Sequence, residues 1–207
     1  TEHAMSCRKG GLILHRHNDL VTTWGQLCGQ ALTPSTVSDE PLIQPSRDVE
    51  VAGNQRTEPS PEIRGDLAVH GFWTKSQTAI FDVRITDTDQ PSHRNTDPAK
   101  VLLRQENEKK TKYGALCTAM RRSFTPLVFS VDGLIGKEAK AASKRLASAL
   151  AGKWKRSYSE VCGFVRSRLS IALIRSSSRC LRADRNPTQR FRSPIWDSGT
   201  GLGLYRM

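Results

Sequence analysis

Polar and apolar residues alternate along residues 79–86, and this alternation is the clearest structural signal in the chain. Successive side chains of a strand point to opposite faces of its sheet, so the segment presents two different faces. One face carries Ala79, Phe81, Val83 and Ile85, and the other carries Ile80, Asp82, Arg84 and Thr86. A charged pair inside an otherwise hydrophobic strand costs free energy unless a partner compensates it. The pattern therefore predicts a strand that carries chemistry at Asp82 and Arg84.

Other apolar patterns predict the framework around this strand. Apolar residues spaced three to four apart predict helices at about 18–31, 99–120, 137–151 and 158–182. Apolar runs predict strands at about 41–44, 66–73, 78–86 and 124–131. Polar, proline-containing segments predict loops at 45–65 and 87–98. This order of elements predicts an α/β domain with a mixed sheet and extra C-terminal helices.

The net charge of +12 predicts a polyanionic partner. Residues 137–192 carry 15 basic and 3 acidic residues, which accounts for the whole excess. On the last predicted helix, four arginines fall on one side, opposite the apolar positions: Arg168, Arg175, Arg179 and Arg182. Such a row of like charges favours a partner with a phosphate backbone, either DNA or RNA.

Several classes of protein find no support in the chain. The five cysteines are odd in number and lack CxxC spacing, which favours a reducing compartment over a disulfide framework. We expect no membrane span and no secretion signal, and the start at Thr1 predicts a fragment of a longer protein. His3 and Cys7 are spaced for zinc but have no paired cysteine motif. Neither a nucleophile elbow nor a phosphate-binding glycine loop is present.

Two aspartates are the candidate centre. If Asp66 and Asp82 lie on adjacent strands, their carboxylates come within reach of one Mg²⁺ or Mn²⁺, with the main-chain carbonyl of Val83 as a third ligand. Such a metal generates hydroxide from bound water, and Arg84 would lie beside the substrate phosphate. The alternative is a plain ion pair between Asp82 and Arg84 on an edge strand. Asp19 is either a further acid or a helix-dipole residue.

The predicted helix at 99–120 offers a lysine to the same centre. Gln105, Lys109 and Tyr113 fall on one face of this helix. Lys109 or its neighbour Lys110 could stabilise charge that develops on a phosphate oxygen. The alternative is that the alternating glutamates and lysines form a solvated helix face.

Taken together, the motifs resemble the segment that follows the reverse-transcriptase domain in invertebrate retrotransposon polyproteins. The resemblance covers about residues 2–182. It is carried by residues 2–11, 16–19, 40–45, 65–67, 81–84, 106–110, 113–114 and 124–130, with Gly133 and Gly136. That segment is similar to restriction-endonuclease-like nucleases of the PD-(D/E)XK type, whose core has the order α-β-β-β-α-β.

The resemblance implies roles for single residues. Asp66 takes the first acidic position, Asp82 the second, and Asp19 the position of a helix acid. Arg84 stands where the family has lysine, and a guanidinium that stays charged cannot act as a general base. Lys109 or Lys110 could substitute from the helix, as migrated lysines do in some relatives. Residues 1–11 resemble the remnant of an upstream zinc knuckle, whose missing ligands predict no bound zinc in this chain.

These expectations lead to three hypotheses. The first is a Mg²⁺- or Mn²⁺-dependent DNA endonuclease domain at 12–182, fused to an upstream reverse transcriptase in the full element and nuclear if active. The second is a degenerate nuclease fold that only binds nucleic acid. The third is a basic RNA-binding protein, which requires the predicted sheet to be absent. Residues 183–207 are predicted to be a disordered tail.

Overall fold

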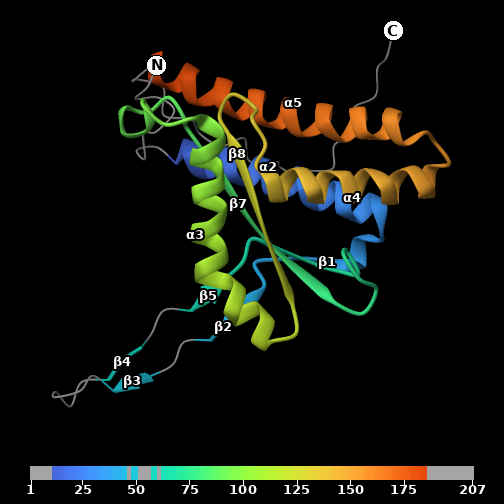
Figure 1. The fold of residues 1–207 in the computed structure, drawn as a ribbon, viewed down its shortest axis with the longest axis horizontal. Coiled ribbons are helices and arrows are strands. Elements are labelled where there is room, and N and C mark those ends of the chain that lie inside the picture. The colour runs from blue at the N-terminus through green and yellow to red at the C-terminus, as the bar shows by residue number, and fades with distance from the viewer. Residues whose placement is uncertain (1–10, 46–47, 51–56, 60–61, 186–207) are drawn as a thin grey trace, which may run out of the picture.

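The computed structural model describes residues 11–45, 48–50, 57–59 and 62–185, as an α/β fold with a four-stranded sheet (Figure 1). The predicted zinc-knuckle remnant lies outside the described residues, apart from Gly11. Most of the predicted tail lies outside them as well. Its first residues belong to the last helix, which ends at Arg185, so the tail cannot begin at residue 183.

The sheet is mixed, as predicted. Its strands lie in the order β1 (Val37–Asp39), β6 (Leu67–His70), β7 (Thr78–Thr86) and β8 (Ser123–Ser130). The first two pairings are antiparallel, and β7 and β8 are parallel. Parallel neighbours need a crossover connection, which helix α3 (Pro98–Ala119) provides. Asp97 caps this helix by accepting a hydrogen bond from the main-chain nitrogen of Ala99 at 2.7 Å.

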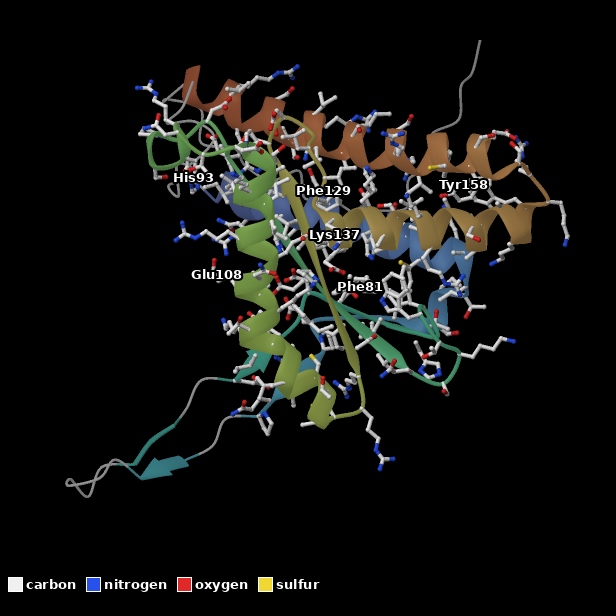
Figure 2. All side chains as sticks on the ribbon, viewed as in Figure 1. Phe81, His93, Glu108, Phe129, Lys137 and Tyr158 are labelled. Atoms are coloured by element: carbon white, nitrogen blue, oxygen red, sulfur yellow. The ribbon has the colours of Figure 1, made fainter. Side chains whose placement is uncertain are left out.

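Helices α2 (Leu12–Ala31) and α4 (Lys137–Trp154) cover one face of the sheet, and α5 (Tyr158–Arg185) packs along both of these helices (Figure 1). The main hydrophobic core lies between them and the sheet. Phe81 and Phe129 contribute to it from β7 and β8, where Figure 2 labels them. The predicted inward side of α5 is confirmed, because Val161, Val165 and Leu169 are each 1% exposed.

Helix α3 packs on the other face and buries far less apolar surface. A small cluster forms there from Ile43, Ala68, Ile80, Tyr113 and Cys117. The predicted alternation along β7 is therefore confirmed: Phe81 and Val83 face the main core, whereas Ile80 faces α3. Asp82 and Arg84 share the face of Ile80, so both lie under α3.

The prediction of a single loop at 45–65 is wrong. Short antiparallel pairs occupy part of it: β3 (Asp48–Glu50) with β4 (Thr57–Pro59), and the predicted strand β2 (Leu42–Gln44) with β5 (Ile63–Arg64). The outer pair projects away from the sheet in Figure 1. Strands of two or three residues are too short for a recognisable alternation. The same reason explains why β1 was missed, together with the short 3₁₀ turns Pro34–Thr36 and Pro91–His93.

Helix α2 begins six residues before the predicted start at Asn18. Its first turns carry His15, Arg16 and His17, which obscure the apolar spacing there. Arg16 is nevertheless only 2% exposed, and burial lowers the pKa of its guanidinium. The early start matters because it brings His17 into the helical part of the chain.

Candidate active site

Asp66 lies directly before β6, close enough to Asp82 of β7 for the two carboxylates to repel each other. Leu67 pairs with Phe81 in the antiparallel register, and the main-chain nitrogen of Asp66 donates to the carbonyl oxygen of Phe81 at 3.0 Å. Gly65 permits this approach, because a Cβ atom there would lie 2.6 Å from Cγ2 of Ile80. The two aspartates are therefore near neighbours, although Asp66 precedes by one residue the strand that it was predicted to begin.

The carboxylate of Asp66 accepts the main-chain hydrogen bond of Val83 that a neighbouring strand would otherwise accept. Its Oδ2 accepts a hydrogen bond from the main-chain nitrogen of Val83 at 2.5 Å, just where β6 no longer runs beside β7. The N–H and C=O of one strand residue point toward the same neighbour. The carbonyl of Val83 therefore also points to the Asp66 side, as its predicted role as a ligand requires.

His17 is the second partner of Asp66. Its Nε2 lies 3.0 Å from Oδ2 of Asp66, reaching across from the first turns of α2. This hydrogen bond raises the pKa of His17 above its ordinary value, because the carboxylate stabilises the imidazolium. The side chains of His17 and Asp66 stay 27% and 23% exposed, so both remain accessible from solvent.

Asp82 is much more deeply buried, with a side chain that is 6% exposed, and it pairs with Lys109. The Nζ of Lys109 lies 2.7 Å from Oδ2 of Asp82. Burial raises the pKa of Asp82, the Lys109 ammonium opposes this shift, and repulsion from Asp66 adds to it. Lys109 on α3 is thus the lysine that reaches the centre.

The other two cations predicted near the site have different partners. Arg84 donates to Oε2 of Glu108 on α3 at 3.0 Å, and Figure 2 labels Glu108 on that helix. The alternative of a simple pair between Asp82 and Arg84 is therefore not formed. Lys110 reaches Glu138 at the start of α4 at 2.6 Å, so it does not reach Asp82.

Asp19 does not join the centre, which corrects the expectation drawn from the resemblance. Its Oδ2 accepts a hydrogen bond from Arg179 on α5 at 3.1 Å. Residues two positions apart on a helix point in different directions, so His17 and Asp19 cannot both face Asp66. The sequence marks His17 only as part of a weak zinc-like spacing, and its contact with Asp66 depends on tertiary packing.

Glu106 has a structural role that the sequence does not reveal. It is 1% exposed, and its carboxylate accepts hydrogen bonds from the main-chain nitrogens of Glu138 and Ala139 at the start of α4. A Cβ atom at Gly136 would collide with this carboxylate, so any larger residue there would have to displace Glu106. In the sequence Glu106 is one of several alternating charges, and nothing distinguishes it from its exposed neighbour Glu108.

The donor chemistry of the centre fits a hard divalent cation. The Oδ1 atoms of Asp66 and Asp82 carry no ion pair or hydrogen bond among the described residues. Across those same residues, no group of three or more His, Cys, Asp or Glu side chains could hold a metal. Two carboxylates and a carbonyl would thus leave several positions to water, as is usual for Mg²⁺.

The arginine stripe of α5 consists of Arg168, Arg175, Arg179 and Arg182. It lies beside α2, and all four side chains are exposed. Arg168 donates to Oε1 of Gln26 at 3.5 Å, and Arg179 bonds Asp19. Within the described part of the chain, Arg175 and Arg182 form no ion pair. The stripe therefore keeps two free cations, both on the side of the sheet covered by α2.

In the described ranges, no helix has the length and apolar character needed to cross a membrane. Comparison with protein-family models and with curated proteins finds no match to this chain.

Proposed function

We propose that this chain is a metal-dependent DNA endonuclease domain of a retrotransposon, which hydrolyses phosphodiester bonds during integration of the element. The observation that carries the proposal is the pairing of Lys109 with Asp82, beside Asp66. Two carboxylates and a lysine lie close together although Asp66 precedes β6, Asp82 lies on β7 and Lys109 lies on α3. The lysine arrives from α3, whereas Arg84 occupies the strand position of the family lysine.

Each residue then has a distinct task. Asp66, Asp82 and the Val83 carbonyl would hold Mg²⁺ or Mn²⁺, which when bound supplies an activated water and a Lewis acid. His17 orients the Asp66 carboxylate through its hydrogen bond. Lys109 stabilises negative charge on the phosphate, and Arg84 can contribute after it leaves the exposed Glu108.

The order of the sheet elements supports the family proposal. Omitting the two small strand pairs, the chain runs α2, β1, β6, β7, α3, β8. This is the α-β-β-β-α-β order of restriction-endonuclease-like nucleases. A DNA substrate, fusion to an upstream reverse transcriptase and a nuclear location belong to the same proposal.

One observation favours the second candidate, a degenerate nuclease fold that only binds nucleic acid. Asp82 and Arg84 are both already paired within the protein, through Lys109 and Glu108. Charges that are satisfied internally need no metal or phosphate. The two candidates differ in whether Lys109 releases Asp82 when a metal is present.

Cleavage of supercoiled plasmid by the purified chain separates the two candidates. We expect nicking with Mg²⁺ or Mn²⁺, none with EDTA, and none in Asp82→Asn, while DNA binding is retained. Asp132→Asn is the matched control, because Asp132 is exposed on the turn after β8. Nicking that survives in Asp82→Asn would remove Asp82 from the mechanism. Salt-sensitive binding without any nicking would establish the binding-only alternative.

A further inference from the structure

The exposed side of α2 carries a stripe of uncharged polar residues. Asn18, Thr22, Gln26 and Gln30 follow one another at intervals of four, so they lie on one face of the helix, and all four are exposed. A quarter of the residues in this chain are charged, yet this stripe carries no charge. Its side chains can donate and accept hydrogen bonds without an ionic partner.

Three hollows share Thr22 of this stripe, and two of them connect the candidate active site with α5. One lies between α2 and α5 and is lined by Thr22, Gln26 and three arginines of the stripe on α5. The other is lined by His17, Asn18, Thr22 and Asp66, at the accessible edge of the candidate active site. Because Thr22 lines both hollows, the surface is continuous from the candidate active site to the arginines.

The charges beside the polar stripe of α2 favour an anion on only one side of this stripe, the side that faces α5. On the α5 side, Arg168 and Arg179 are held by Gln26 and Asp19, and Arg175 lies in the sequence between them. Arg175 also lines the hollow, and it has no ion pair among the described residues. On the β1 side, the second hollow is lined by Asp39, Glu40 and Arg64, and Arg64 is already paired with Glu62. The carboxylates of Asp39 and Glu40 repel phosphate there. A phosphate backbone is therefore stable on the α5 side.

We propose that the backbone of duplex DNA lies along this face of α2, where Arg175 contacts a phosphate and Thr22 and Gln26 donate hydrogen bonds to neighbouring backbone oxygens. The inference rests on the proposed nuclease function and names the surface that leads the substrate to Asp66. Uncharged side chains and arginines together make most contacts between proteins and DNA backbones. Because α5 and β1 flank α2, the helix cannot enter a major groove, and the contact is independent of base sequence.

The lining of the hollows favours a duplex over a single strand. Recognition of single-stranded DNA or RNA depends on bases stacked on aromatic side chains. Neither hollow is lined by phenylalanine, tyrosine or tryptophan. The surface thus offers contacts to a backbone and none to unstacked bases.

The test places a carboxylate on this surface and an identical one elsewhere. Thr22→Glu adds a negative charge to the stripe, and Thr118→Glu adds it to an exposed position of α3, which covers the opposite face of the sheet. Binding of a short fluorescein-labelled duplex is followed by fluorescence anisotropy at several salt concentrations. We expect Thr22→Glu to weaken binding about tenfold, the effect of losing roughly one phosphate contact, and Thr118→Glu to change it less than about twofold.

A second variant keeps the test decisive if Thr22→Glu unfolds. Arg175→Gln removes a cation from an exposed site, and we expect it to lower the slope of log K against log salt by about one. Duplexes rich in A·T and in G·C should bind equally, and single-stranded DNA and duplex RNA more weakly. Tighter binding of either of these two would overturn the choice of duplex DNA.

Plasmid nicking by the same protein preparations shows whether a negative result contradicts only the α2 surface or the nuclease function as well. If the unmodified chain nicks and binds DNA but Thr22→Glu and Arg175→Gln bind like Thr118→Glu, the α2 surface is wrong and the nuclease stands. If the unmodified chain neither binds nor nicks DNA, both proposals fall.

Discussion

The two faces of the central sheet are built on different principles. The face under α2 and α4 is mainly apolar, with Phe81, Val83, Leu127 and Phe129 in one continuous core. The face under α3 has a small apolar cluster at one end and charged pairs at the other, including Lys109 with Asp82. The alternating side chains of β7 serve both faces at once, since Phe81 and Asp82 are neighbours in sequence.

This difference means that one face of the sheet mainly stabilises the fold, whereas the other carries the candidate active site. Apolar burial drives folding, whereas a buried carboxylate opposes it unless the interaction with its partner is strong enough. The α3 side retains two buried carboxylates, Asp82 and Glu106, with different partners. Glu106 holds the start of α4 in place, and Asp82 holds only a lysine. Substitutions on the first face should therefore affect folding, and substitutions at Asp82 or Lys109 should affect function.

The largest effect on stability is expected for Phe81→Ala. Phe81 is fully buried in the main core, so the truncation should cost about 3–5 kcal/mol of unfolding free energy. Ile80→Ala, at an equally buried position under α3, should cost roughly 2 kcal/mol, because the smaller cluster can relax. Urea unfolding followed by tryptophan fluorescence measures both. Equal costs would mean that the two faces contribute alike to stability.

The largest effect on activity is expected for Lys109→Ala. Loss of a charge that stabilises the reacting phosphate should reduce the nicking rate by roughly a hundredfold or more. Lys110→Ala is the matched control, because Lys110 pairs with Glu138, and its rate should stay within about threefold of the unmodified chain. A greater loss of nicking rate in Lys110→Ala than in Lys109→Ala would mean that Lys110, and not Lys109, supplies the catalytic charge.

The fold followed largely from patterns within single segments. The alternation at 79–86 gave β7 and the directions of its side chains, and the apolar spacing gave α3, α4 and α5 within a few residues. A strand or helix of eight or more residues repeats its pattern often enough to be recognised. β1 and β5 contain two or three residues, so no repeat exists for a pattern to reveal.

The candidate site could be predicted only in part, because most of its contacts join distant segments. Asp66 and Asp82 follow from the strand order, but their partners His17 and Lys109 depend on how α2 and α3 dock. The sequence favoured Lys109 but left Lys110 as an alternative, and the packing of α3 places Lys109 against Asp82 and Lys110 against Glu138. The role expected for Asp19 failed for the same reason, since its partner comes from α5.

A smaller loss of stability is expected for Glu106→Ala. The change leaves the main-chain N–H groups of Glu138 and Ala139 without their buried acceptor, at a cost of about 2 kcal/mol. Glu106→Gln keeps an acceptor oxygen and should lose less. Hydrogen exchange at the amides of Glu138 and Ala139 should accelerate in Glu106→Ala. Unchanged exchange there would show that Glu106 does not hold the start of α4.

The smallest effect expected is a gain in stability for Asp82→Asn. Burial raises the pKa of Asp82, so the folded state binds its proton more tightly than the unfolded state does. The neutral carboxyl therefore contributes stability that is complete below the unfolded pKa and is lost as the pH rises through the folded pKa. Asparagine never ionises and escapes this loss, so at neutral pH the variant should be more stable by about 1 kcal/mol.

Thermal unfolding of both proteins across the acid to neutral range measures this gain. The advantage of Asp82→Asn should be absent at the most acidic pH and should grow as the pH rises past the ordinary pKa of an aspartate. Asp132→Asn, at an exposed position, should give a nearly constant difference. An Asp82→Asn protein that is less stable at neutral pH would mean that the attraction of Lys109 outweighs the burial of Asp82. Asp82 would then stabilise the fold, and the distinction between a stabilising face and a functional face of the sheet would not hold at this residue.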